Sequence, residues 1–204
     1  MDTPQPLWSP SPERVARANL TAFMQLVNER HKLALRDYAG LYRWSTDRSG
    51  DFWTAVWDFG GVIAEARGER VLVDGDKMPG ARFFPDARLN FAENLMRLRD
   101  DSDAMVFWGE DKVKRRMSHR ELHEVVSRLQ QALAAAGGGE GDRVAAFLPN
   151  MPEAVIAMLA AASLGATWTS CSPDFGVQGV LDRFGQVEPT VLFCCDGYYY
   201  NGKV

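Results

Sequence analysis

The stretch AAASLGATWTSCSPDFGVQGVLDRF, residues 160–184, decides the fold that we expect for this chain. It predicts four pieces in succession: a helix end, a short buried strand, an irregular turn and the start of a new helix. The turn, Ser170–Gly176, is polar and follows the carboxyl end of the strand. Open α/β sheets bind ligands outside the carboxyl ends of their parallel strands. We therefore expect a binding site at this turn.

Residues 104–204 alternate between strand and helix patterns throughout. Short apolar runs between turn residues predict strands, and apolar positions three and four apart predict helices. Because helices separate the strands, the sheet is expected to be parallel with right-handed crossovers. The expected elements are a hairpin of strands 104–108 and 112–117, strands 142–148, 166–170 and 190–195, and helices that begin near residues 118, 150 and 177.

The helices of this part carry recognisable cap residues. Ser118 and Glu121 have the spacing of a capping box. Asn150 is expected to cap the second helix, which Gly165 ends, and Asp174 is expected to cap the third. The cap positions therefore predict where these helices begin and where the second one ends.

Residues 1–100 have a different character, because they are rich in aromatic side chains and lack the strand–helix alternation. Ser11 or Ser9 is expected to cap a helix whose apolar face includes Phe23 and Val27. The other expected elements are a short helix or turn at 37–45, a helix at 51–59, a short strand at 70–73 and a helix that ends near residue 100. We thus divide the chain into a mainly helical extension, residues 1–100, and an α/β part, residues 101–204.

The composition bounds the class of protein. Hydrophobic residues make up 46% of the 204 residues, which is ordinary for a globular chain. Acidic residues outnumber basic ones, 27 to 23, and this balance argues against a nucleic-acid partner. We find no apolar stretch long enough to span a bilayer. The start of the chain lacks the pattern of a secretory signal, so a cytoplasmic location and no membrane partner are expected.

The three cysteines, Cys171, Cys194 and Cys195, do not form a disulfide framework, because their number is odd and two are adjacent. Cys194 and Cys195 lie in an apolar run and are expected to be buried. No CxxC spacing occurs, and no metal site is expected.

Several motifs resemble those of one enzyme family. The most particular are SPDFG at 172–176, GVLDRF at 179–184 and YNGK at 200–203. Others are LYRWS at 41–45, ARLNFAENL at 87–95, GDRV at 141–144 and LPN at 148–150. Together they resemble the acetoacetyl-CoA synthetase branch of the adenylate-forming acyl-CoA synthetases, over nearly the whole chain. The resemblance implies an α/β fold. It would be a partial doubly wound parallel sheet, the start of the adenylation domain, preceded by a mainly helical N-terminal extension.

The resemblance also implies a reaction. Acetoacetate and ATP, with Mg²⁺, would form an acyl-adenylate and pyrophosphate, and CoA would then give acetoacetyl-CoA and AMP. The chain contains no Ser/Thr-rich phosphate loop. Its Gly-rich run, 137–141, precedes a strand and is interpreted as a linker, since phosphate loops lie at helix N-termini. We therefore expect no catalytic residue, ATP site or Mg²⁺ site here. The remainder of the same chain would lie beyond Val204, and these residues alone would be inactive.

Part of a CoA site is what the resemblance assigns to this chain. In the related acetyl-CoA synthetases, the turn after the second parallel strand contacts the CoA adenine, and a basic residue after the third meets the phosphates. By position these are Ser172, Pro173, Asp174 and Lys203. Where the wider pattern has arginines, this chain has tyrosines before Lys203, which offer stacking surface instead.

Other interpretations stay open. Lys203 is equally compatible with a solvated loop residue. The acid substrate is compatible with another short acyl acid, since the pocket residues are not in this chain. A third possibility, of a different class, is a non-catalytic module that binds CoA or a nucleotide.

Overall fold

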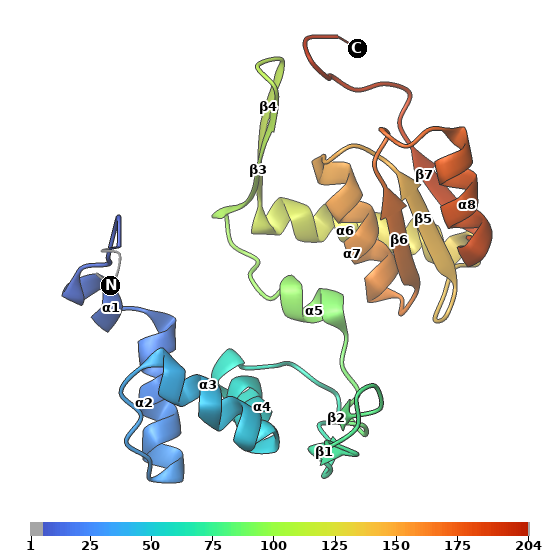
Figure 1. Cartoon of the computed structure of the whole chain (residues 1–204). Helices are drawn as coiled ribbons and strands as arrows, with labels where there is room; N and C mark the ends of the chain where they lie inside the picture. The colour runs from blue at the N-terminus through green and yellow to red at the C-terminus, as the bar shows by residue number, and fades with distance from the viewer. Residues whose placement is uncertain (1–5, 204) are drawn as a thin grey trace. The chain divides into compact units, whose positions relative to one another are not determined.

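The computed structural model describes residues 6–203. The chain forms two compact units that divide between Arg88 and Leu89 (Figure 1). The sequence-based division at residue 100 and this structural division differ over the segment that contains α5 (Phe91–Leu95), which packs against α7 (Pro152–Ser163).

The first unit contains four helices in its described part: α1 (Pro12–Ala16), α2 (Asn19–His31), α3 (Tyr38–Asp47) and α4 (Ser49–Gly60). Ser11 caps α1, as predicted, and accepts a hydrogen bond from the backbone N–H of Arg14 at 3.3 Å. The single helix that we expected from the Ser11 cap through Val27 is instead two helices, because α1 ends before α2 begins. Phe23 and Val27 lie on α2 and are buried.

The core of the first unit joins its three longer helices. Phe23 and Val27 of α2 cluster with Leu41 of α3 and Ala55 of α4. A two-stranded antiparallel sheet follows, formed by β1 (Leu72–Val73) and β2 (Arg82–Phe83). The first of these strands was predicted, whereas its partner was not. The partner is only two residues long and therefore carries no alternating pattern.

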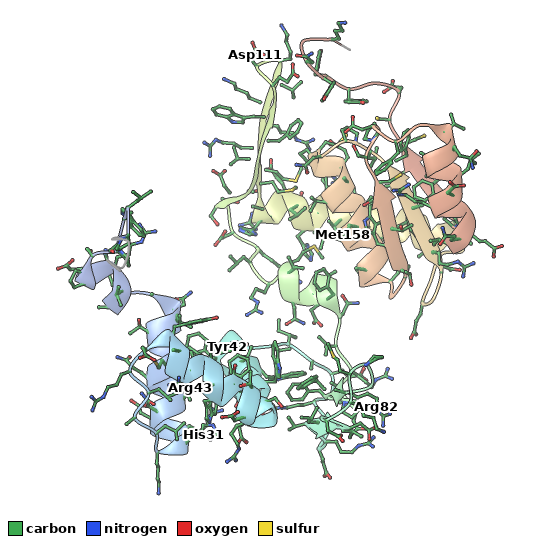
Figure 2. The ribbon with its side chains drawn as sticks, in the orientation of Figure 1. His31, Tyr42, Arg43, Arg82, Asp111 and Met158 are labelled. Carbon is green, nitrogen blue, oxygen red and sulfur yellow. The ribbon has the colours of Figure 1, made fainter. Side chains whose placement is uncertain are left out.

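The second unit holds the alternating part. After α5 come β3 (Asp103–Gly109), β4 (Val113–Ser118), α6 (His119–Ala135), β5 (Arg143–Phe147), α7, β6 (Thr167–Cys171), α8 (Val177–Val187) and β7 (Val191–Cys194). β3 and β4 form the predicted antiparallel hairpin, and Figure 2 shows Asp111 at its tip. β5 pairs in parallel with β6 on one side and with β7 on the other, which confirms the parallel sheet.

Helices cover both faces of this sheet (Figure 1). On one face α7 packs against Val144 of β5, together with Val191 and Phe193 of β7. On the other face, Phe184 of α8 packs against Ala145 of β5 and Cys171 of β6. Val144 and Ala145 are consecutive residues of β5 and point to opposite faces, as in a strand that is covered on both sides.

The cap predictions were partly correct. Ser118 and Glu121 form the capping box, with the Ser118 hydroxyl accepting from the Glu121 N–H at 3.2 Å. Gly165 follows α7 with a left-handed φ of 74°. The prediction for Asn150 was wrong, because the N-cap is Met151 and makes no side-chain hydrogen bond. α7 begins at Pro152, a residue whose fixed φ suits the first helical position.

One of the cysteine predictions was also wrong. Cys195 is half-buried, but Cys194 is exposed. On β7, Val191 and Phe193 point into the core, so Leu192 and Cys194 lie on the other face. Among the described residues, the cluster that α8 forms on that face includes β5 and β6 and does not extend to β7.

In the part of the chain that the structure describes, no helix is both long and apolar enough to cross a membrane.

Candidate functional site

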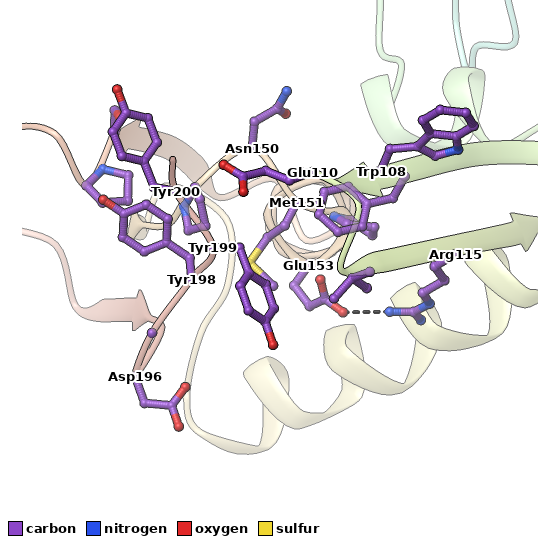
Figure 3. Close-up of a pocket in the computed structure, with 18 of the residues that line it drawn as sticks. Trp108, Glu110, Arg115, Asn150, Met151, Glu153, Asp196, Tyr198, Tyr199 and Tyr200 are labelled. Atoms are coloured by element: carbon purple, nitrogen blue, oxygen red, sulfur yellow. Dashed lines mark hydrogen bonds and ion pairs between the residues drawn. The ribbon is translucent and has the colours of Figure 1, made fainter. Parts of the chain in front are cut away.

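A cavity of about 770 Å³ lies where the loops after the three parallel strands meet the β3–β4 hairpin (Figure 3). Because parallel strands run in one direction, the loops at their carboxyl ends emerge at a single edge of the sheet. Five segments line the cavity: residues 107–110, Val113 with Arg115, residues 149–153, residues 172–174 and residues 196–200. This is the edge at which the sequence predicted a site.

The cavity has aromatic walls on two sides. Phe107 and Trp108 come from the end of β3, and Tyr198, Tyr199 and Tyr200 come from the loop after β7. The rings of Tyr198 and Tyr200 lie 6.4 Å apart between centroids and are inclined at 56°. Flat rings held at a cavity wall give a planar ligand surfaces on which to stack.

The charged side chains of the lining are mostly acidic. Glu110, Glu153, Asp174 and Asp196 line the cavity, against Arg115 alone among the basic residues of its described lining. Arg115 donates to the Glu153 carboxylate at 2.7 Å (Figure 3). The positive charge is thus already paired. The cavity favours neutral or aromatic groups of a ligand over its phosphates.

Ser172, Pro173 and Asp174, the turn residues that the sequence analysis named as binding candidates, all line the cavity. The Ser172 hydroxyl donates to the Asp174 carboxylate at 2.9 Å and accepts from the Asp174 N–H at 3.3 Å. The prediction that Asp174 caps α8 was wrong, since the N-cap is Gly176 and it makes no side-chain hydrogen bond. Asp174 is held within its own turn by Ser172 instead.

Lys203 lies in a tight turn beside the cavity and is not itself part of the lining. Tyr200 and Lys203 exchange two backbone hydrogen bonds, of 2.9 Å and 3.1 Å. Between them Asn201 and Gly202 have φ values of 53° and 74°, the positive values that Asn–Gly turns adopt. The Lys203 side chain is exposed. The YNGK motif is therefore a turn that presents a lysine at the edge of the site.

The hairpin residues and the segment 149–153 were not predicted as part of the site. The sequence indicated the hairpin turn around Glu110, but nothing local shows which loop a hairpin tip will meet. The Gly-rich run lies elsewhere, between α6 and β5. There Gly139 donates its N–H to the Asp142 carboxylate at 2.7 Å. This position between a helix and a strand agrees with its interpretation as a linker.

Among the described residues, no group of three or more His, Cys, Asp or Glu side chains is arranged to hold a metal ion.

A parallel sheet with helices on both faces and a cavity at its carboxyl edge defines the open α/β class that binds ligands at strand ends. The chain belongs to the AMP-binding enzyme family, whose model matches residues 91–203. A second family model, acetyl-coenzyme A synthetase N-terminus, matches residues 38–95. The two matches together cover most of both units.

Individual proteins agree with these family matches. An acetoacetyl-coenzyme A synthetase of Rhizobium meliloti (strain 1021) is 56% identical over 203 residues, which are 100% of this chain and 31% of that protein. A malonamoyl-CoA synthetase of Penicillium aethiopicum is 38% identical over 190 residues, 90% of this chain and 26% of that protein.

A solved structure is also similar. The acetoacetyl-CoA synthetase from Streptomyces lividans matches with a TM-score of 0.92 and 46% identity, over 98% of this chain and 31% of that one. The chain thus spans less than a third of the length of each of these three relatives.

Proposed function

We propose that these residues serve as the amino-terminal part of an acetoacetate–CoA ligase. The reaction would convert acetoacetate, ATP and CoA to acetoacetyl-CoA, AMP and pyrophosphate through an acyl-adenylate. The observation that carries this proposal is the 56% identity to the Rhizobium meliloti acetoacetyl-coenzyme A synthetase, which extends over the whole of this chain. Similarity at that level across both units favours the same overall reaction over a mere likeness of fold.

CoA is the ligand that we assign to the cavity. Its size and its aromatic walls suit the adenine ring of a nucleotide, and Ser172, Pro173 and Asp174 form one side. The acidic lining does not suit phosphate groups. We therefore place the CoA phosphates outside the cavity, toward the ammonium group of Lys203, which is exposed at the adjoining turn.

ATP and Mg²⁺ are proposed as cofactors of the whole ligase. When bound, they would activate the acid as an adenylate. The residues described here include no phosphate loop at a helix N-terminus, so we assign to this chain the positioning of CoA alone. Its partners are then acetoacetate, CoA and the remaining segments of the ligase.

A second candidate is a ligase for another short acid. The malonamoyl-CoA synthetase of Penicillium aethiopicum is 38% identical over 90% of this chain, so identity in this region is shared by ligases with different acids. Substrate profiling of the gene product that contains these residues separates the two candidates. A higher kcat/KM with malonamate than with acetoacetate would favour the second.

The ligase proposal is tested with a chimera. The matching residues of the Rhizobium meliloti enzyme are replaced by this chain, and acetoacetate-dependent release of AMP is measured with ATP and CoA. We expect turnover within about tenfold of the parent enzyme, because a well-matched segment preserves the CoA site. A folded chimera that forms the adenylate but transfers nothing to CoA would contradict the assignment of the cavity.

The 204-residue chain alone provides the complementary test. We expect it to release no AMP with acetoacetate, ATP and CoA. Release of AMP would contradict the proposal that this chain positions CoA and that the remaining segments of the ligase catalyse the reaction. Tight binding of CoA without any activity in the chimera would favour the non-catalytic module instead.

A further inference from the structure

The turn Tyr200–Lys203 is joined to a segment that lies far away in the sequence. The backbone N–H of Gly202 donates a hydrogen bond to the Glu110 carboxylate at 3.0 Å, across a separation of 92 residues. Glu110 belongs to the tip of the β3–β4 hairpin, whereas Gly202 follows the last strand of the sheet. Both lie in the second compact unit.

The turn itself is a closed structure. The backbone groups of Tyr200 and Lys203 that face each other are already paired, at 2.9 Å and 3.1 Å. The N–H of Gly202 is not used by this pairing and is the donor that reaches Glu110. Among the hydrogen bonds recorded for the described residues 197–203, this is the one that links the segment to the rest of the unit. Its loss would remove this link between the turn and the hairpin.

The hairpin, by contrast, is well anchored. Its two strands pair from Asp103 to Ser118, and the N–H of Lys112 closes the tip on the carbonyl of Gly109 at 3.2 Å. Arg115 ties the outer half of the hairpin to Glu153 at the start of α7. Glu110 therefore presents its carboxylate to the Tyr200–Lys203 turn from a hairpin that is held by its own strand pairing.

Glu110 and Tyr200 line the same cavity, and Figure 3 shows both of them at its edge. The hydrogen bond thus joins Glu110 to the turn that carries both Tyr200 and Lys203. In terms of charge alone, the Glu110 carboxylate repels an anionic ligand. Its contribution must come from the hydrogen bond that it accepts.

We propose that Glu110 is a positioning residue, which holds the Tyr200–Lys203 turn at the mouth of the cavity in the geometry that CoA needs. The proposal rests on the proposed function for its ligand. The contact itself does not, and the two parts are tested separately.

The first experiment measures the contact in the full 204-residue chain. Chymotrypsin cleaves after tyrosine, and the initial rate of cleavage at Tyr198–Tyr200 reports how often the segment leaves the hairpin. We expect Glu110→Ala to raise this rate about fivefold, since it removes a hydrogen bond to a charged acceptor. Glu110→Gln keeps an acceptor oxygen and is expected to remain within about twofold.

Asp111→Ala is the matched control. Asp111 is the next residue of the same hairpin tip, is exposed, and has no recorded hydrogen bond in the described structure. Its replacement removes the same charge and leaves the contact intact, so the cleavage rate should not change. Circular dichroism of each variant shows whether the unit remains folded. An unchanged rate in folded Glu110→Ala overturns the proposal.

The second experiment measures the KM for CoA in the chimera described above. We expect Glu110→Ala to raise it about fivefold, Glu110→Gln to remain within about twofold, and acetoacetate-dependent exchange of pyrophosphate into ATP to stay unchanged in both. A lower KM in both Glu110 variants would show that only the charge matters and would overturn the positioning role. A parent chimera without any ligation contradicts the proposed function instead, and the cleavage rates then decide the contact alone.

Discussion

At the scale of single residues, Asp58 makes the stability of the first unit depend on pH. Its carboxylate accepts hydrogen bonds from Arg30 at 2.6 Å and from Arg67 at 2.8 Å. Partial burial opposes ionisation of the carboxyl, but the hydrogen bonds and charges of the two arginines outweigh it and lower the pKa of Asp58. A group with a lowered folded-state pKa stabilises the fold above its unfolded-state pKa, and this stability is lost as the pH falls through the folded-state value.

We therefore expect Asp58→Asn to lower the free energy of unfolding by about 1 kcal/mol near neutral pH. The difference should shrink as the pH falls below the unfolded-state pKa and vanish once the pH is below the lowered folded-state pKa, where the carboxyl of the parent is protonated in both states. Urea unfolding at several pH values measures both effects. Asp76→Asn removes an exposed carboxylate of the same unit that has no recorded partner among the described residues, and should change little. Equal losses of unfolding free energy in Asp58→Asn and Asp76→Asn would show that the effect comes from the change in net charge rather than from the contacts with the two arginines.

Lys203 gives a prediction about the ligand. If the CoA phosphates lie beside its ammonium group, Lys203→Ala in the chimera should raise the KM for CoA about threefold to tenfold. Lys203→Arg keeps the charge and should recover most of the affinity, and the effect should shrink as salt screens the charge. Steady-state kinetics at low and high ionic strength measure this. An unchanged KM in Lys203→Ala would leave Lys203 as a solvated loop residue.

The residues of the site differ in how well a sequence reveals them. Ser172, Pro173 and Asp174 directly follow β6, a short strand pattern between two helix patterns, so their place at the carboxyl edge of a parallel sheet is predictable from local pattern. Glu110 is part of the same cavity, but its place there depends on where a hairpin tip meets a loop 92 residues away. No local pattern contains that information.

At the scale of elements, the capping box of α6 gives a stability prediction. Ser118 and Glu121 each satisfy a backbone N–H of the other, at 3.2 Å and 2.8 Å. Since α6 carries Leu122, Val126 and Leu133 into the core, fraying of its first turn weakens that packing. We expect Ser118→Ala to lower the free energy of unfolding by about 1 kcal/mol. Ser118→Thr keeps the acceptor and should remain close to the parent in the same urea titration.

The elements themselves were largely predictable, and the exceptions have physical reasons. Ser118 and Glu121 have the spacing of a capping box, in which each side chain accepts a hydrogen bond from the backbone of the other residue, and this spacing predicts the start of α6 correctly. Asn150 and Glu153 have the same spacing, but α7 begins at Pro152, whose fixed φ suits the first helical position, and the Glu153 carboxylate pairs with Arg115. The strands β1 and β2 have only two residues each, so neither the helical nor the strand periodicity has room to appear.

At the scale of the whole molecule, the sheet order accounts for the position of the site. β5 lies between β6 and β7, so the loops after all three strands converge at one edge, and the hairpin of the same unit adds the remaining wall. Parallel pairing was predictable because helices separate the strands. The order of the strands was not, because each strand is short and apolar and its residues do not specify which neighbour it takes.

The exposed face of β7 leads to a prediction about association. Leu192 is 52% exposed, and Leu181 and Val177 of α8 are 60% and 77% exposed. Apolar side chains on an edge strand favour pairing between molecules. We therefore expect the 204-residue chain to associate as its concentration rises, which light scattering coupled to gel filtration measures.

The substitution Leu192→Lys should shift the association equilibrium toward the monomer, because a charge on the strand opposes such contacts. Leu20→Lys changes a leucine that is 48% exposed in the first unit and is the matched control. If that variant shifts the equilibrium equally, the association depends on general hydrophobicity, and a monodisperse parent at all concentrations would contradict association through β7 altogether.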